Sequence, residues 1–329
     1  YEMSASLVGS EMCIRDSNLI GYKSCGESIV FFLKADKSII YSGIVDCYEV
    51  DATNMAAILL KDNHVNSVDF LCWTHPHEDH TMGMENILGQ FCNSSTEVWI
   101  PPFVLSDIEK LPTKTIKLYK TLFEKIRIKQ RNSISIREVS DTKLLYRTLC
   151  LGNCNPSPIL FEIKSFAPDS SLLNDMKINE RFNNTNVYSI GLIINIGHYC
   201  MLLSGDVENQ TLSHIPEFNF EEYKFIDYIK IPHHGSKGSD ALMKKFVNLC
   251  DYSPSVAATT VYRQHKLPNQ EILELYKGYK GIELYSTGSI VNFEKEKKQY
   301  GIIRTTFDVL EKRKFCIETH LYGNAISIE

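Results

Sequence analysis

The sequence predicts a layered α/β fold in which two sheets are covered by helices. Segments with strand character alternate with segments of helical period along most of the chain, and pairs of β-rich segments lie near both ends. The chain has 329 residues, which suits one large domain or two small ones. Because no internal repeat, low-complexity tract or Pro/Gly-rich linker interrupts it, we expect a single domain of two similar halves.

Strands are expected where short runs of β-branched and aromatic residues are bounded by polar or turn residues. Residues 28–34 and 39–47 lie on either side of a polar turn and are predicted to form a hairpin. Residues 67–74 are predicted to form a buried strand that runs directly into a histidine-rich loop. The remaining expected strands are 97–100, 159–166, 187–196, 199–204, 225–231, 255–261, 282–285, 290–293, 300–305 and 315–320.

Helices are expected where apolar residues recur with a helical period. The expected helices are 55–61, 81–91, 112–131, 207–214, 240–249 and 270–277. The segment 112–131 is also basic, with seven Lys or Arg residues against the single acid Glu124. A basic face of this kind is expected to face solvent, and the alternative is a contact surface for the phosphates of a nucleic acid.

Composition excludes several classes of protein. Apolar residues make up 43% and charged residues 23% of the chain, which is ordinary for a globular protein and unlike a disordered chain, a collagen or a coiled coil. No apolar run reaches the roughly 18 residues of a membrane-spanning helix. The ten cysteines do not form a disulfide frame, and with no secretory signal we expect a cytoplasmic protein. The net charge of −5 argues against a protein coated in nucleic acid.

The first residues differ in character from the rest of the chain. Residues 4–17 resemble a translated sequencing-adapter read-through, and they lack the basic and long apolar regions of a signal peptide. We therefore expect residues 1–17 to be an artefact or a disordered arm that packs poorly. Residues 18–329 are expected to form the single domain.

The strongest motif is a cluster of metal-ligand residues at the end of the buried strand 67–74. His75, His77, Asp79 and His80 fall within six residues. Imidazole and carboxylate groups suit Zn²⁺ and its first-row neighbours. Two histidines that are two residues apart on an extended chain face the same way and can hold one ion. The last two residues lie where the chain is predicted to turn into a helix, so they can hold a second ion.

Later segments place further ligands where apolar strands end. Asp206 follows one strand, and its carboxylate can bridge two cations. His233 and His234 follow another strand. Because adjacent residues of an extended chain face opposite ways, one of the two is expected to be the ligand and the other to lie beside the metal or substrate. His234 is the favoured ligand. Taken alone, His265 has the character of a surface-loop histidine, and within this series it is a candidate for the last ligand of the second ion.

These blocks together resemble those of the metallo-β-lactamase-fold hydrolases, and the run 75–80 is the most specific of them. The HHGS block at 233–236 and the segment 186–189 resemble one branch more closely. That branch contains the soluble metal domains of DNA-uptake competence (ComEC-type) proteins and the phosphorylcholine esterases. Asp46 matches the family's early strand-end Asp, which usually supports the metal site.

The resemblance implies a four-layer αββα sandwich with one hydrolase domain over residues 18–329. It also implies two Zn²⁺ ions at one edge of the sheets, with Mn²⁺ or Fe as alternatives. The metal ligands implied are His75, His77, Asp79, His80, Asp206, His234 and His265.

A mechanism follows from the same resemblance. A hydroxide that bridges two metals attacks a phosphorus or carbonyl centre, and the metals stabilise the developing negative charge. Asp206 is implied to bridge the metals and Asp79 to steer the nucleophile, while His233 or His265 protonates the leaving group. The residues expected to support the site or to contact a substrate phosphate are Asp46, Ser236 and Lys237.

The sequence constrains the substrate less closely than the site. A phosphodiester, either a small molecule or a nucleic acid, is the expected substrate. Hydrolysis of a carboxylic ester, lactone or amide by the same site is the alternative. A protein that has kept the fold as a binding module and lost catalysis is the alternative of another class.

Overall fold

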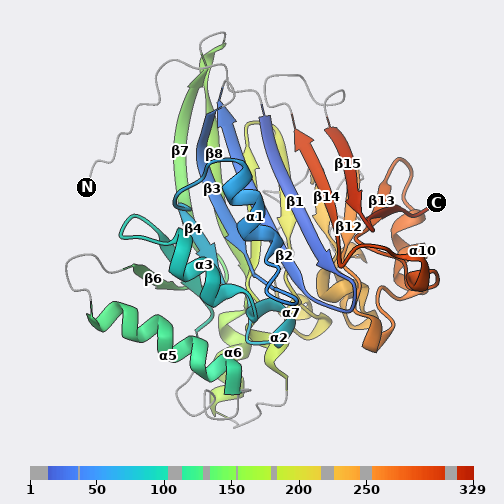
Figure 1. The fold of residues 1–329 in the computed structure, drawn as a ribbon, viewed down its shortest axis with the longest axis horizontal. Helices are drawn as coiled ribbons and strands as arrows, with labels where there is room; N and C mark the ends of the chain where they lie inside the picture. Colours follow the sequence, from blue (N-terminus) through green and yellow to red (C-terminus); the bar gives the residue numbers. More distant parts are fainter. Residues whose placement is uncertain are drawn as a thin grey trace.

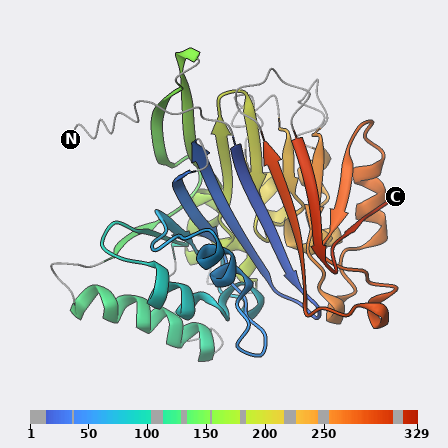
Figure 2. The ribbon, with the colours of Figure 1, turned by 45° about the horizontal axis from the view of Figure 1, so that its top comes forward.

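Two sheets face each other across the centre of the molecule, with helices on the outer face of each (Figure 1). The computed structural model describes residues 14–35, 38–102, 113–128, 134–152, 155–178, 184–215, 226–244, 254–307 and 317–329. Figure 2 shows the same layers from another side, with the strands of the two sheets running past each other.

Within the described residues each sheet has eight strands. The order in the first sheet is β15 (Ile317–Gly323), β14 (Tyr300–Phe307), β1 (Ile14–Tyr22), β2 (Glu27–Ala35), β3 (Ser38–Val45), β4 (Phe70–Cys72), β5 (Glu97–Ile100) and β6 (Ser135–Glu138). The order in the second is β16 (Ile326–Ser327), β13 (Glu283–Ser286), β12 (Val256–Thr259), β11 (Tyr228–Lys230), β10 (Tyr199–Leu203), β9 (Gly191–Ile196), β8 (Asn155–Ala167) and β7 (Leu144–Gly152).

Each sheet changes from antiparallel to parallel pairing partway across. In the first sheet, β15, β14, β1, β2 and β3 pair antiparallel, and β3, β4, β5 and β6 pair parallel. In the second sheet, β7 to β10 pair antiparallel, β10 to β13 pair parallel, and the edge strand β16 pairs antiparallel with β13. The change from antiparallel to parallel pairing therefore falls at β3 in one sheet and at β10 in the other, and the second sheet changes back at β13.

Alternation of apolar side chains along the strands builds the layers. In β2, Phe31 points into the core between the sheets, whereas Val30 and Phe32 belong to the core under the outer helices. Ile194 and Ile193 of β9 divide in the same way between the central and outer cores. Successive side chains of a strand face opposite sides, so an apolar run without alternation gives a strand that is buried on both faces.

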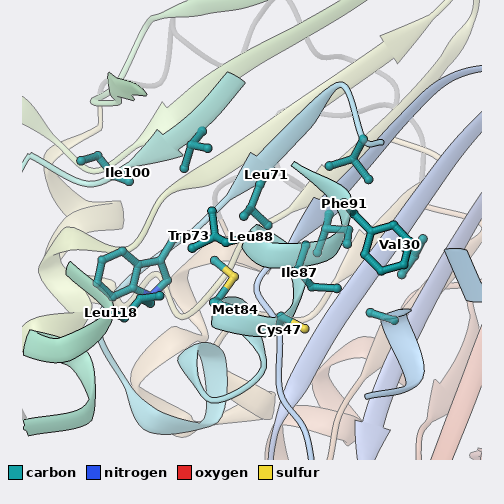
Figure 3. Packing of buried hydrophobic residues seen from close by; sticks show 14 of the residues in the cluster. Val30, Cys47, Leu71, Trp73, Met84, Ile87, Leu88, Phe91, Ile100 and Leu118 are labelled. Carbon is teal, nitrogen blue, oxygen red and sulfur yellow. The ribbon is translucent and has the colours of Figure 1, made fainter. Parts of the chain in front are cut away.

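The outer helices complete a four-layer αββα sandwich, as predicted. Helices α1 (Met55–Asp62), α3 (Met84–Phe91), α5 (Thr113–Ile128) and α6 (Ser170–Ile178) pack on the first sheet. Helices α7 (Asn209–His214) and α10 (Gln270–Lys277) pack on the second. Figure 3 shows Ile87 and Leu88 of α3 and Leu118 of α5 against Leu71 and Trp73 from β4 and the residue that follows it. Among the described helices, none is long and apolar enough to cross a membrane.

The expectation that the chain up to residue 17 lies outside the fold is wrong for residues 14–17. They form the start of β1, which pairs with β2 and β14. Asp16 is buried and accepts hydrogen bonds from Lys34 Nζ (2.6 Å), Arg304 Nη2 (2.6 Å) and Thr306 Oγ1 (2.9 Å). Residues 1–13 lie outside the described residues.

Other departures from the expected elements are local. Residues 290–293 form bends and the start of a 3-10 turn instead of a strand, and the side chain of Val291 is 85% exposed. The expected helix 81–91 is divided into α2 (Glu78–Thr81) and α3 at Gly83. The expected strand 187–196 begins at Gly191, after a 3-10 turn over Thr185–Tyr188. The structure adds β1, β6, β7, α6 and β16, which were not expected. Of the expected helix 240–249, residues 245–249 lie outside the described residues.

The role of Asp16 can be tested by replacing it. Asp16→Ala removes an acceptor shared by two cationic side chains, and hydrogen bonds of this kind contribute about 1.5–3 kcal/mol. We expect the free energy of unfolding in urea to fall by about 2–3 kcal/mol. Asp62→Ala, at an exposed position of α1, should change it by less than about 0.5 kcal/mol. Equal effects of the two substitutions would contradict the placement of residues 14–17 in the sheet.

Candidate metal centre

The predicted ligands gather where parallel strands of the two sheets end. Asp46 follows β3, and the run 75–80 follows β4 of the same sheet. Asp206 follows β10 and His234 follows β11 of the other sheet. In open α/β sheets, ligands bind outside the carboxyl ends of the strands where the strand order switches. The site lies at this position in both sheets at once.

The loop after β4 is fixed on both sides. His75 is fully buried, and His77 precedes α2, which carries Asp79 and His80. On the outer side, the carbonyl of Pro76 accepts a hydrogen bond from Thr115 Oγ1 of α5 (3.1 Å).

The strand end and the first helix turn after the loop are also joined by side chains. The indole Nε1 of Trp73 donates to Thr81 Oγ1 (3.0 Å). This bond lies beside the metal-ligand run in sequence. The histidine-rich run is therefore held by the helix layer as well as by the sheet.

Besides Asp46, His75 and His80, whose atoms also lie within 4.8 Å of one another, the ligand atoms form two adjacent groups. His75, His77 and Asp206 offer atoms within 4.8 Å of one another, and so do Asp79, His80 and His234. In the second group, His234 Nε2 lies 3.0 Å from Asp79 Oδ2 and 3.3 Å from His80 Nε2.

The carboxylate of Asp206 lies between the two groups. Its Oδ2 is 3.7 Å from His75 Nε2 and 3.6 Å from His234 Nε2, and its Oδ1 is 3.4 Å from His80 Nε2. Gly205 has a left-handed backbone (φ 50°), and a Cβ there would lie 2.7 Å from Ser189 Oγ. That hydroxyl accepts the Asp206 N–H (2.8 Å), so the turn needs glycine and holds Asp206 in place.

Asp46 lies behind the candidate ligands. Its Oδ1 accepts the Thr74 N–H (2.7 Å), and its Oδ2 accepts the Thr74 hydroxyl (2.6 Å) and faces His80 Nδ1 (2.6 Å). Thr74 Oγ1 also lies 3.0 Å from His75 Nδ1. Carboxylates in this position fix the orientation and tautomer of metal-binding histidines. Asp46 contacts the His80 imidazole directly and reaches the His75 imidazole through the Thr74 hydroxyl.

The backbone at residues 233–234 separates the two adjacent histidines. Both have left-handed conformations, with φ of 48° and 51°. His234 is fully buried among the ligands. His233 lies at the rim, with Nδ1 2.8 Å from Glu208 Oε1 and Nε2 3.8 Å from Asp206 Oδ2. His234 therefore lies among the candidate ligands, and His233 lies beside them.

The buried groups shift one another's protonation. Burial lowers the pKa of His75 well below its usual value. Burial also opposes protonation of His80, but the carboxylates of Asp206 and Asp79 outweigh it and raise the pKa of His80 well above its usual value. For Asp206 burial raises the pKa, but the surrounding imidazoles outweigh it and hold the pKa well below its usual range. A neutral imidazole and an ionised carboxylate are the forms that bind metals, so His75 and Asp206 already favour the binding form, whereas His80 would have to release a proton.

The residues present fit a pair of divalent cations. Among the described residues, His75 Nε2 is buried and has no hydrogen-bond partner. Buried polar atoms without a hydrogen-bond partner are rare in folded proteins. Where they occur, a functional role such as binding an ion is one explanation. Four imidazoles and two carboxylates in two adjoining groups are also the donor types that zinc and its neighbours prefer.

His265 does not belong to the groups of ligand atoms that the structure forms among the described residues. His265 is exposed, and its ring packs against Tyr262 (4.7 Å between centroids), whose other neighbour is His234 (5.5 Å). Tyr262 occupies the position between the two histidines, which corrects the expectation that His265 is a ligand or a proton donor.

The hydroxyl of Ser236 is used within its own turn, where Oγ accepts the Gly238 N–H (3.3 Å).

Lys237 is directed away from the ligand groups. It is exposed and pairs with Glu271 of α10 (2.5 Å). The expected contact of Lys237 with a substrate phosphate therefore has no support in its position.

Several residues of the site were not predicted. They are Glu27, Thr74, Thr185, Glu208, Lys230 and Thr260. Thr185 Oγ1 lies 2.5 Å from His77 Nε2. One signal was visible in the sequence: Lys230 interrupts an apolar segment three residues before His233.

Comparison of the sequence with models of protein families and with curated proteins gives no match. Among solved structures, a protein of Parabacteroides distasonis assigned as a metal-dependent hydrolase is similar at 15% identity and a TM-score of 0.39, over 82% of this chain and 97% of that one. A diphosphatase of the PhnP family is similar at 13% identity and a TM-score of 0.43, over 90% and 99%. Zinc-bound PqqB from Methylobacterium extorquens is similar at 9% identity and a TM-score of 0.39, over 79% and 85%. These likenesses are distant.

A titration with zinc would test the placement of His234 among the candidate ligands and of His265 outside them. We expect His234→Ala to weaken the binding of one zinc equivalent by more than about 100-fold, beyond the 10–100-fold typical for a residue that only supports a ligand. His265→Ala should leave both equivalents unchanged, because its side chain lies outside the ligand groups. Titration against a chromophoric chelator measures both. Loss of a zinc equivalent in His265→Ala would show that Tyr262 does not separate it from the site.

Proposed function

We propose that this chain is a metal-dependent hydrolase that holds two divalent cations and acts on a phosphodiester. The observation that carries the proposal is the convergence of six ligands from two sheets into two adjoining groups. His75 and His77 would hold one ion, and Asp79, His80 and His234 the other, with Asp206 shared. A scaffold protein without a metal would not need so many imidazole and carboxylate ligand atoms to face one another inside the fold.

When bound, the ions would act as Lewis acids that make hydroxide available at neutral pH and offset negative charge on the substrate. The side chains of the chain provide the remaining functions. Asp206 sets the spacing of the two groups, because each of its oxygens faces a ligand of the second group and Oδ2 also faces His75. Asp46 and Thr74 hold the imidazoles of His75 and His80 in one orientation.

His233 is placed to give a proton to the leaving group. It is partly exposed at the rim, and Glu208 lies on its Nδ1 side, which leaves Nε2 toward Asp206 and the site. Glu208 is itself held by Asn184 Nδ2 (2.6 Å) and Asn186 Nδ2 (3.1 Å). An imidazole oriented by a carboxylate is a common arrangement of a general acid or base.

The choice of a phosphodiester is supported by the sequence blocks. The HHGS and Asn186–Ser189 segments resemble those of competence-type metal domains and phosphorylcholine esterases, and the latter act on phosphoesters. A nucleic-acid substrate is favoured less, because the described part of the basic helix α5 is partly neutralised. Lys114 pairs with Glu78 (2.6 Å) and Lys117 with Glu85 (3.7 Å).

The reaction class can be tested with a substrate panel. We expect metal-dependent hydrolysis of bis(p-nitrophenyl) phosphate, and its loss by more than about 100-fold in Asp206→Ala and after chelation. A lactone, a β-lactam and single-stranded DNA complete the panel. Hydrolysis of the lactone or β-lactam alone would move the assignment to the alternative reaction class. DNA cleavage that falls steeply with salt would indicate a nucleic-acid substrate. If Asp206→Ala keeps full activity, the proposed site is wrong.

The role of His233 is tested by varying the leaving group. We expect His233→Ala to reduce kcat by about 10²–10⁴-fold for a diester with a poorly acidic alcohol as leaving group. The reduction should be much smaller for p-nitrophenolate, which departs without a proton. Glu208→Gln should show the same selectivity in weaker form. An equal loss for both leaving groups, together with weaker zinc binding, would make His233 a ligand instead.

A further inference from the structure

A buried row of polar groups lies behind His234. Its Nδ1 is 2.6 Å from Thr260 Oγ1, and Thr260 Oγ1 donates to Glu27 Oε2 (2.8 Å). Glu27 Oε1 forms an ion pair with Lys230 Nζ (2.8 Å). Lys230 and Thr260 are fully buried, and Glu27 is 1% exposed. The four groups come from both sheets, since Glu27 begins β2 whereas the others lie at the ends of β11 and β12.

The protons of this row can be assigned from its chemistry. The Glu27 carboxylate, paired with an ammonium group, only accepts hydrogen bonds. Thr260 has a single hydroxyl proton, and its bond to Glu27 uses that proton. Its oxygen must therefore accept a hydrogen bond from His234, so the proton of this imidazole is on Nδ1. In the neutral imidazole, which is the form that binds a metal, Nε2 faces Asp79 and His80 with a free lone pair.

We propose that Glu27, acting through Thr260, positions His234 and sets its tautomer for metal binding, with Lys230 holding Glu27 in place. The proposal rests on the proposed metal centre. Glu27 and Thr260 are positioning residues, because in the structure they contact the ligand and not the place between the two ligand groups.

The opposite side of the site has the same arrangement. There the Thr74 hydroxyl donates to Asp46, and its oxygen lies 3.0 Å from His75 Nδ1. A carboxylate and a threonine thus lie behind one ligand histidine from each sheet, although both carboxylates, Asp46 and Glu27, belong to the first sheet. In each case the threonine follows a parallel strand: Thr74 lies two residues after β4, and Thr260 directly follows β12.

Burying the ion pair of Glu27 and Lys230 behind His234 carries a free-energy penalty, which favours a functional role for the pair. Removing two charges from water is opposed by a desolvation penalty that often exceeds their attraction, so a buried ion pair is weak evidence for stability. Lys230 Nζ also donates to the carbonyl of Gly205 (2.9 Å) and lies 3.7 Å from Asp206 Oδ1. The same ammonium therefore fixes Glu27 and the turn that carries the shared carboxylate Asp206.

The test compares two neighbouring buried threonines. Thr260→Val removes the hydroxyl with little change of shape, and Thr259→Val does the same for a residue of β12 whose hydroxyl bonds only to the Thr260 carbonyl (3.3 Å) among the contacts seen. Zinc is titrated into each metal-free full-length protein against a chromophoric chelator. We expect Thr260→Val to weaken one of the two zinc equivalents by about 10–100-fold. Thr259→Val and Thr260→Ser should bind both as the unmodified protein does.

A second readout does not depend on metal or activity. In protein labelled with ¹⁵N-histidine, the metal-free His234 ring should show its proton on Nδ1, and Thr260→Val should lose this single tautomer while Thr260→Ser keeps it. Equal zinc binding by Thr260→Val and the unmodified protein would overturn the proposal, as would an equal loss in Thr259→Val. If the unmodified protein binds no zinc while the tautomer is fixed as described, the proposed metal centre fails and the hydrogen-bond row stands.

Discussion

The site depends on the burial of negative charge. Asp46, Asp79 and Asp206 are each 5% exposed or less and lie within one small region. Burying a carboxylate is costly unless charge partners and hydrogen-bond donors surround it. Here the partners are imidazoles, and the imidazoles in turn need acceptors at their far nitrogens. The chain supplies those acceptors as threonine hydroxyls and a further carboxylate, so the polar groups form a connected set in which each one orients the next.

The two sheets share the task because neither presents a full set of ligands. Four of the six come from the loop after β4 in the first sheet, and Asp206 and His234 come from the second. Their relative placement is therefore set by the apolar core between the sheets, where Phe31 and Phe161 stack with centroids 6.1 Å apart. Protein cores are close-packed and transmit small displacements, so packing far from the site helps to set the ligand positions.

What the sequence could predict follows from how local each signal is. The run 75–80 holds four ligands in one segment, and its position after a strand fixes their direction. His265 was misplaced because a turn over Arg263–His265 decides which way its side chain points, and no pattern in the sequence encodes that turn. Glu27 lies 233 residues from Thr260, and only the pairing of two sheets brings them together. The first strand was missed because its start was set aside as foreign to the fold.

The hydrogen bond from Trp73 to Thr81 makes the Trp73 indole an intrinsic fluorescence probe of the metal-ligand loop. The chain has two tryptophans, and this indole lies fully buried beside the histidine-rich loop with its N–H held by the short helix that carries His80. Indole emission responds to nearby charge and to changes in hydrogen bonding. Occupation of the second ligand group would thus alter the ultraviolet fluorescence of the untreated protein, and loading could be followed in solution without a dye or a substrate.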